Sequence, residues 1–232
     1  MRPRAGRIVD ASSSRPTVPR KRTRTIPIAD LQRFFAVTAQ RFPEYLPPLL
    51  TLYLTGARID EVRHLQPEDV ILKERKLLYR VKPQWSPKDA QDREIPLVDP
   101  LLSVLTRVLA RHPGGPWLFQ RPDRKTLACK RCGSRVQHLG NMRKTIRRIA
   151  EVSQRVTHHL FRHCHNTHGQ QLGVRQEVAM ELLGQQTTQV NRMYRDVSWQ
   201  ELVGAAQRLG TLMATSVVGV PESENSPDRT PR

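Results

Sequence analysis

Two short polar segments, far apart in the chain, carry side chains that could act together on a phosphodiester. Arg58 and Glu61 stand three residues apart, and so do His159 and Arg162 in the run His-His159-Leu-Phe-Arg162-His. Residues at that spacing share one face of a helix. Two guanidinium groups can hold the non-bridging oxygens of a phosphate bidentately, which a lysine ammonium cannot do. An imidazole beside such an arginine could accept or relay a proton at the same phosphate.

Each of these residues also has a structural interpretation. A single arginine in so basic a chain usually lies on the solvated surface. Glu61 could hydrogen-bond the Arg58 guanidinium and orient it, or the two could form an ordinary helix-surface ion pair of about 0.3 kcal/mol. His158 stands four residues before Arg162 and competes with His159 for the same role. Three more histidines crowd the same segment and could simply pack or face solvent: His163, His165 and His168.

The net charge indicates a polyanionic partner. The chain of 232 residues has 39 Lys and Arg against 21 Asp and Glu, a formal net charge of +18. Cations placed on phosphates release condensed counterions, which favours binding to nucleic acid. A ribosomal or merely adhesive basic protein is the plainer alternative. The apolar runs fall far short of the roughly 20 residues of a membrane span, and no secretory signal is visible at the start. We therefore expect a cytoplasmic, nucleoid-associated protein without membrane contact.

Composition divides the chain into one central domain and two tails. Residues 1–25 hold eight Lys or Arg and one acid among Pro, Ser and Thr, which predicts a disordered basic arm able to lie along DNA. A solvated tail or a remnant of a longer chain fits this segment equally well. Residues 216–232 are predicted to form a disordered tail. Residues 26–215 are long enough for one sizeable domain but hardly for two.

Hydrophobic periodicity in the central domain predicts a mostly helical fold with one small antiparallel sheet. Alternating runs between turn residues predict strands over 70–72, 76–81 and 93–97. Helical spacing of apolar residues predicts helices over 28–41, 45–55, 58–65, 99–111, 139–152, 157–172, 175–183, 188–194 and 198–213. The fold class is therefore α+β.

The order and spacing of these motifs resemble the catalytic domain of the tyrosine recombinase (phage integrase) family. The resemblance covers residues 28–213. Besides the segments around Arg58 and Arg162, it depends on Leu-Leu-Gly-Gln185, on Tyr194 nine residues later, and on Lys88 ahead of an Ile-Pro-Leu run. Each motif alone is weak evidence, whereas their combined order is fairly specific.

The resemblance implies a site-specific DNA recombinase of integrase or invertase type, which cleaves and rejoins strands through a 3′-phosphotyrosyl intermediate. Tyr194 would be the nucleophile, held near the cations that a phenol of pKa about 10 needs at neutral pH. Arg58 and Arg162 would hold the scissile phosphate, while His159 would move protons. The covalent link conserves the bond energy, so no cofactor is expected. The implied partners are double-stranded DNA and further copies of the chain in a homotetramer, with no small-molecule substrate.

Two features depart from the family pattern, and a third, the identity of the proton-donating lysine, stays open. Lys88 is the expected proton donor to the leaving 5′-oxygen, but Lys82 and Lys76 are alternatives because the hairpin length varies. Gln185 stands where the family usually has His or Trp. Its amide can still donate a hydrogen bond, and otherwise the protein would be slow or decayed. Most relatives also carry an N-terminal core-binding domain, so a minimal or truncated recombinase is expected.

Other classes of protein fit parts of the sequence. Residues 176–194 mimic a helix-turn-helix, which would make the chain a non-catalytic DNA-binding regulator. That interpretation leaves Arg58 and Lys88 unexplained. A type IB topoisomerase would share the chemistry, although the chain is short for one. Cys129 and Cys132 form half of a zinc site, with reduced thiols in a basic DNA-facing loop as the alternative.

Overall fold

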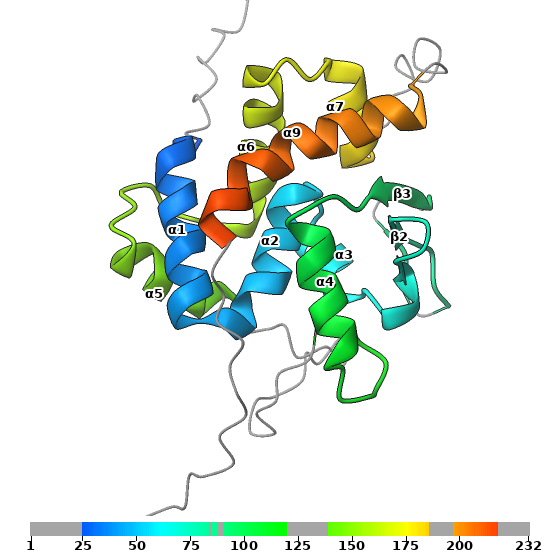
Figure 1. The fold of residues 1–232 in the computed structure, drawn as a ribbon, viewed down its shortest axis with the longest axis horizontal. Coiled ribbons are helices and arrows are strands. Elements are labelled where there is room, and N and C mark those ends of the chain that lie inside the picture. The colour runs from blue at the N-terminus through cyan, green and yellow to red at the C-terminus, as the bar shows by residue number, and fades with distance from the viewer. Residues whose placement is uncertain (1–24, 84, 88–90, 120–138, 186–196, 218–232) are drawn as a thin grey trace, which may run out of the picture.

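The predicted α+β fold is confirmed, with a bundle of helices and one small antiparallel sheet at its side (Figure 1). The structure, a computed structural model, describes residues 25–83, 85–87, 91–119, 139–185 and 197–217. The predicted helix over 188–194 lies outside these ranges. The described elements are α1 (Ile28–Arg41), η1 (Pro43–Tyr45), α2 (Leu46–Leu54), α3 (Ile59–Arg63), η2 (Pro67–Asp69), β1 (Val70–Ile71), β2 (Lys76–Tyr79), β3 (Arg93–Pro96), α4 (Leu101–Ala110), α5 (Leu139–Ile149), α6 (His158–Gln171), α7 (Gln176–Leu183) and α9 (Trp199–Val217).

Helix α2 is the buried centre of the helical layer. It packs against α1, α3, α4, α6 and α9 (Figure 1). Around it, Phe34 and Phe35 of α1, Tyr53 of α2 and Phe161 of α6 pack with ring centroids between 5.6 and 6.0 Å apart. Aromatic pairs at such separations add to the stabilisation from burial. Because these rings connect α6 to the core, they also hold in place the helix that carries His159 and Arg162.

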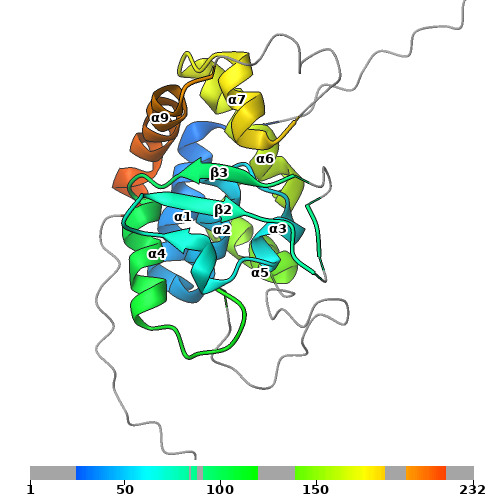
Figure 2. The same ribbon diagram turned by 90° about the vertical axis from the view of Figure 1, so that its right-hand side faces the viewer.

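The sheet has the strand order β1-β2-β3 and covers one side of the helices (Figure 2). Leu77 in β2 lies opposite both Val70 and Ile95. Leu77 and Tyr79, two residues apart, therefore share the buried face of the sheet, as the alternation of a strand requires. The connection from β2 to β3 includes the predicted proton donor Lys88, which is not among the described residues.

Helix α9 packs on its own domain. It contacts α1, α2, α6, α7 and β3, and its buried stripe includes Leu202, Leu209 and Met213. The helix is therefore a core element of this domain, and it continues to Val217, beyond the predicted end at residue 213. None of the described helices combines the length and the apolar character needed to cross a membrane.

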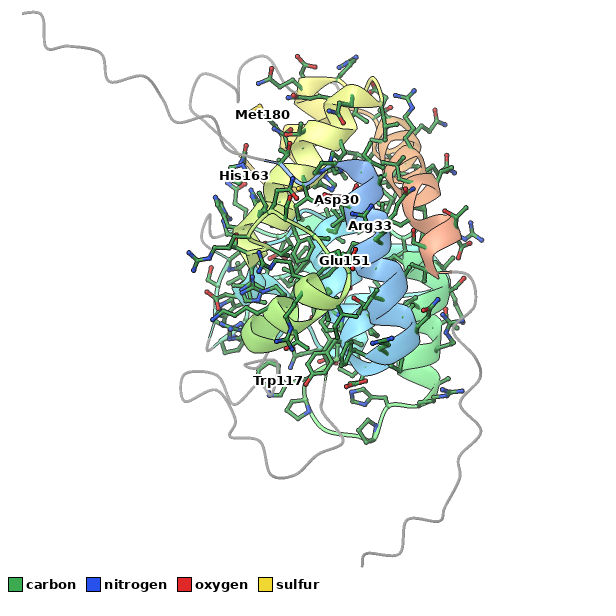
Figure 3. The ribbon with its side chains drawn as sticks, turned by 90° about the vertical axis from the view of Figure 1, so that its left-hand side faces the viewer. Asp30, Arg33, Trp117, Glu151, His163 and Met180 are labelled. Carbon is green, nitrogen blue, oxygen red and sulfur yellow. The ribbon has the colours of Figure 1, made fainter. Side chains whose placement is uncertain are left out.

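Helix α1 also contacts α5. Arg33 donates from its Nε atom to the carbonyl of Ala150 at 3.4 Å, and its Nη2 atom pairs with Asp30 at 2.6 Å. Figure 3 shows Asp30 and Arg33 on α1, and Glu151 in the turn that follows α5. This contact fixes the end of α5, and the chain continues from there to the start of α6.

Gly56 makes the turn between α2 and α3 and lies directly against α6 and α7. Its φ of +61° belongs to the left-handed region that favours glycine. A Cβ at this position would overlap Leu183 Cδ2 and approach His165 Cδ2 to 2.9 Å. The absence of a side chain thus lets the residues just before Arg58 contact α6, which carries Arg162, and α7, which Gln185 follows.

Replacing Gly56 by alanine is expected to cost more stability than the same change at Gly173. Gly173 also has a positive φ, +74°, but a Cβ there would meet no atom within 4 Å. Gly173→Ala should therefore cost only the backbone strain, about 1 kcal/mol. Gly56→Ala adds overpacking, for a total of roughly 3 kcal/mol. Chemical denaturation measures both free energies of unfolding, and equal losses would contradict the close approach at Gly56.

Candidate active site

Arg58 is fixed at the start of α3 by a capping interaction. Its backbone N–H donates to Glu61 Oε2 at 2.6 Å, the arrangement in which an acid at the third helical position caps the residue before the helix. The Arg58 side chain is 28% exposed, and its Nη1 atom lies 3.7 Å from Glu61 Oε1. The cap fixes the backbone of Arg58, while part of its guanidinium group stays accessible to a ligand.

Glu61 binds chiefly to Arg93 rather than to the Arg58 guanidinium. Arg93 of β3 donates from Nη1 to Glu61 Oε1 at 2.6 Å and from Nη2 to Oε2 at 2.9 Å. The Glu61 side chain is 1% exposed and that of Arg93 9%. The interpretation of Glu61 as part of a helix-surface ion pair is therefore wrong, and its expected contact with Arg58 is mainly through the backbone. Arg93 is a site residue that sequence analysis missed.

The Glu61–Arg93 pair keeps the carboxyl group ionised. Burial raises the pKa of Glu61, but hydrogen bonds and charge from Arg93, together with the Arg58 N–H, outweigh it and leave the pKa below its usual value. Arg93 also lies over the ring of Tyr79, 4.4 Å from its centroid. A buried ion pair of this kind needs several such contacts to compensate for its desolvation. It joins β3 to the residues that position Arg58.

Arg162 connects the turn before Arg58 to the end of α7. It is 5% exposed, and it donates from Nη1 to the carbonyl of Gly56 at 2.8 Å and from Nη2 to that of Leu183 at 2.7 Å. Gly56 precedes Arg58 by two residues, and Leu183 precedes Gln185 by two. The structure therefore brings together the three chain segments that carry Arg58, Arg162 and Gln185.

Gln185 follows a tight helix end. Gly184 takes the left-handed conformation, with φ +60°, and the Gln185 N–H donates to Met180 O at 3.0 Å. A Cβ on Gly184 would stand 3.1 Å from Arg93 Nη1. The Gln185 side chain is exposed. Its amide is accessible at the point where α7 ends beside Arg93 and Arg162.

The environments of His158 and His159 differ. His159 is exposed on the first turn of α6, and its ring contacts that of His163 edge to face at 4.4 Å. Figure 3 shows His163 on the same helix. His158 is half-buried, and burial, followed by the charge of Arg143, lowers its pKa to about 3. Exposure therefore favours His159 over His158 as the residue that moves protons at the scissile phosphate.

His165 and His168 are structural residues. His165 is 1% exposed and donates from Nδ1 to the carbonyl of Tyr53 at 2.9 Å. His168 donates from Nε2 to Ile26 O at 2.9 Å, so its Nδ1 accepts the Tyr53 hydroxyl at 3.0 Å. The Ile26 N–H in turn donates to Cys164 Sγ at 3.3 Å. These bonds tie α6 to α2 and to the first described residues.

Acidification below pH about 6.5 is expected to destabilise the fold through His165. Burial lowers the pKa of His165 to about 4, despite the opposing bond to Tyr53. Between these pH values the unfolded chain binds the proton and the folded chain does not. The contribution of His165 to stability is thus fully present above pH about 6.5 and falls by roughly 3 kcal/mol towards pH 4. Denaturation at several pH values should show this slope, and it should be weaker in His165→Gln. Parallel pH profiles for the two proteins would contradict the assignment.

Several predicted residues lie outside the described part of the chain. These are Lys88, Tyr194, Cys129 and Cys132, whose roles stay predictions. Within the described residues, no three His, Cys, Asp or Glu side chains group as metal ligands would. The second half of the helix-turn-helix pattern, over 187–194, is also outside the described ranges.

The two alternative lysines lie in different places. Lys82 follows β2 and donates from Nζ to Asp69 Oδ2 at 2.6 Å and to His64 O at 2.5 Å, next to the end of α3. Lys76 pairs with Glu94 at 2.9 Å and lies 5.2 Å from the indole ring at the start of α9. Of these two, only Lys82 lies beside the helix that Arg58 begins.

The chain belongs to the phage integrase family, whose sequence model matches residues 31–201. Two tyrosine recombinases XerA are similar in sequence. That of Pyrococcus furiosus is 28% identical over 168 residues, 71% of this chain and 54% of its own. That of Pyrococcus horikoshii is 31% identical over 164 residues, 69% of this chain and 53% of its own. The chain therefore spans about half the length of the curated relatives it matches.

Solved integrase and recombinase structures share the fold. The integrase from mycobacterium phage Brujita has a TM-score of 0.63 at 20% identity, covering 89% of this chain and 67% of its own. A XerA recombinase has a TM-score of 0.59 at 18% identity, and the match covers 83% of this chain and 65% of that one. The Tn1549 transposon integrase, in complex with transposon right end DNA, has a TM-score of 0.57 at 17% identity. This match covers 82% of this chain and 67% of that one. The resemblance to tyrosine recombinase catalytic domains is therefore confirmed for the fold.

Proposed function

We propose that this chain carries the catalytic domain of a site-specific DNA recombinase that works through a 3′-phosphotyrosyl intermediate. The observation that carries the proposal is the pair of bonds from Arg162 to Gly56 O and Leu183 O. They join the segments of Arg58, Arg162 and Gln185 in a member of the integrase family. Tyr194 follows Gln185 by nine residues in the sequence, which is the interval that the resemblance to the family depends on.

In this mechanism the arginines stabilise the charge that develops on the phosphorus. Arg58 and Arg162 hold the non-bridging oxygens of the scissile phosphate, and fixed cations in that position supply the largest share of catalysis. A guanidinium has five N–H donors, so bonds to protein and to phosphate can coexist on one group. The capping bond to Glu61 and the Glu61–Arg93 pair keep the Arg58 backbone in place during the reaction.

The covalent step is a transesterification. The Tyr194 phenol gives its proton to the His159 imidazole, and its oxygen forms a bond to phosphorus. The bond from phosphorus to the 5′-oxygen breaks, and that oxygen takes a proton from the Lys88 ammonium group. The products are a 3′-phosphotyrosyl link and a free 5′-hydroxyl. Attack of a 5′-hydroxyl on the link reverses the step and rejoins the strand. Proton transfer by such side chains contributes about 10²- to 10⁴-fold.

Duplex DNA is the proposed partner, and strand exchange requires more than one copy of the chain. The charge of +18 supports a polyanionic partner, and the Tn1549 integrase with a similar fold is in complex with DNA. We expect a homotetramer on DNA, with the basic residues 1–25 along the phosphates and a location at the nucleoid. Gel filtration and cross-linking with bound DNA would measure the number of copies.

The proposal can be tested with a pool of nicked duplexes of randomised sequence. Attack near a nick releases a short fragment, so the covalent product cannot be rejoined and accumulates. Wild-type protein should give a shifted band on a denaturing gel, and Tyr194→Phe should not. Sequencing the attached DNA would identify the target site. Binding without a covalent band would favour the regulator, and supercoil relaxation without exchange between molecules would favour the topoisomerase.

A further inference from the structure

Four basic or titratable side chains gather at one end of α6, outside the candidate active site. Arg63 is the last residue of α3, Arg143 lies on α5, Arg155 lies in the turn before α6, and His158 is the first residue of α6. The charges of Arg143 and Arg63 both act on His158, and the charge of Arg155 acts on Arg143. We call Arg63, Arg143, Arg155 and His158 the cationic cluster. Two of the elements that form it, α3 and α6, also position Arg58 and carry His159.

The charges within the cationic cluster are poorly balanced. Asp60 pairs with Arg63 at 2.9 Å and offsets one guanidinium. Burial, followed by the charge of Arg155, lowers the pKa of Arg143 to about 10. Burial is also the main reason that the pKa of His158 is low, and Arg143 and Arg63 are the next causes. These groups are therefore close enough to repel one another, and an anion bound among them would relieve that repulsion.

Hydrogen bonding in the cationic cluster is also incomplete. Arg143 donates from Nη1 to the carbonyl of Val156. By contrast, the Nε atoms of Arg63 and Arg143 and the Nε2 atom of His158 are buried, and within the described residues they have no hydrogen-bond partner. Buried polar atoms are nearly always satisfied, and exceptions often mark a missing water or ion. The three atoms are therefore available to hydrogen-bond with an anion.

The start of α6 strengthens the case. This helix has 14 residues, and Thr157 caps it by accepting the Leu160 N–H at 3.1 Å. A helix N-terminus carries partial positive charge, which favours an anion. The cationic cluster lies beside the candidate active site but uses different side chains, since Arg63 and Arg58 stand at opposite ends of the five-residue helix α3. An anion at each place would fit two different phosphates.

We propose that the cationic cluster binds a DNA backbone phosphate other than the scissile one. This inference rests on the proposed function, since the anion is taken to belong to the DNA substrate. The phosphate oxygens accept hydrogen bonds from the guanidinium groups, and the bound phosphate holds the duplex in register beside Arg58 and His159. Contacts of this kind position DNA and carry no sequence information by themselves.

The test is the salt dependence of non-covalent binding to a short duplex of arbitrary sequence. The full chain with Tyr194→Phe serves as the parent, so that no covalent product forms. Arg63→Gln and Arg155→Gln are compared with Arg107→Gln, which removes one exposed arginine from α4 on another part of the surface. Losing one phosphate contact lowers the slope of log K against log salt by about 0.9. We expect that reduction in the cluster variants and a slope equal to the parent's in Arg107→Gln.

Equal slopes in all three variants would overturn the proposal. Arg155 is exposed, so Arg155→Gln keeps the test valid even if Arg63→Gln fails to fold. Inorganic phosphate alone is the second probe, followed by NMR of the His158 ring. If inorganic phosphate shifts the NMR signals of the His158 ring while the duplex does not, the cationic cluster binds small anions and the proposal is wrong. Absence of a Tyr194 adduct in the wild-type protein would refute the proposed function without altering these slopes.

Discussion

Replacing Arg162 by lysine is expected to lower the rate of covalent adduct formation by roughly 10²- to 10³-fold, the cost of removing one transition-state donor. Lysine keeps the charge but has no planar fork. Its single nitrogen cannot reproduce the geometry in which two separate nitrogens of Arg162 bond the carbonyls of Gly56 and Leu183 at 2.8 and 2.7 Å. The segments that carry Arg58 and Gln185 would then lose their common anchor, and the phosphate would lose a bidentate contact.

The measurement is the single-turnover rate of adduct formation on a nicked duplex, with DNA affinity measured separately. Arg148→Lys makes the same chemical change at an exposed position of α5 and should react at nearly the wild-type rate. We expect Arg162→Lys to keep most of its DNA affinity, because the net charge is unchanged. An adduct rate within threefold of the control, which is about 0.7 kcal/mol, would contradict the role of Arg162.

Replacing Glu61 by glutamine is expected to destabilise the fold by about 3–5 kcal/mol, the usual cost of leaving a buried charge without its partner. Arg93 would lose both bonds to the carboxylate while remaining 9% exposed over Tyr79. The cap on Arg58 would also change from a charged to a neutral acceptor. The variant should therefore be less stable, and Arg58 should be held less firmly at the start of α3.

Glu94→Gln is the matched control for this prediction. It makes the same change on β3, but Glu94 is 51% exposed and pairs with Lys76, so the expected loss is below about 1 kcal/mol. A loss of 1 kcal/mol lowers the Tm of a domain of this size by about 3 °C, so the Tm of Glu61→Gln should fall by about 10 °C. Equal shifts in the two variants would show that the Glu61–Arg93 pair contributes no more than a surface ion pair.

Local sequence signals predicted the elements well. The apolar spacing of 28–41 matched α1 at both ends, because that helix has one buried stripe that includes Leu31, Phe34 and Phe35. The helix predicted over 45–55 was less accurate at its start, where residues 43–45 form the separate 3₁₀ turn η1. Prolines in the first turn of a helix are compatible with either form. The strands were shorter than predicted, since β2 ends at Tyr79.

Contacts between distant residues could not be predicted from spacing. Glu61 and Arg58 are neighbours on α3, and the local pattern therefore favoured a bond between their side chains. The stronger partner, Arg93, is 32 residues away on a strand, and only the tertiary fold brings it under Glu61. The bonds of Arg162 to Gly56 and Leu183 are of the same kind. The family pattern identified which residues belong to the site, whereas the structure identified what holds them.

The most direct test of the account is to locate the covalent bond itself. Wild-type protein trapped on a nicked duplex would be digested, and the peptide that retains a nucleotide would be sequenced by mass spectrometry. The account predicts a nucleotide joined through its 3′-phosphate to the phenolic oxygen of Tyr194. An adduct on a different side chain, or duplex binding that never yields one, would contradict it.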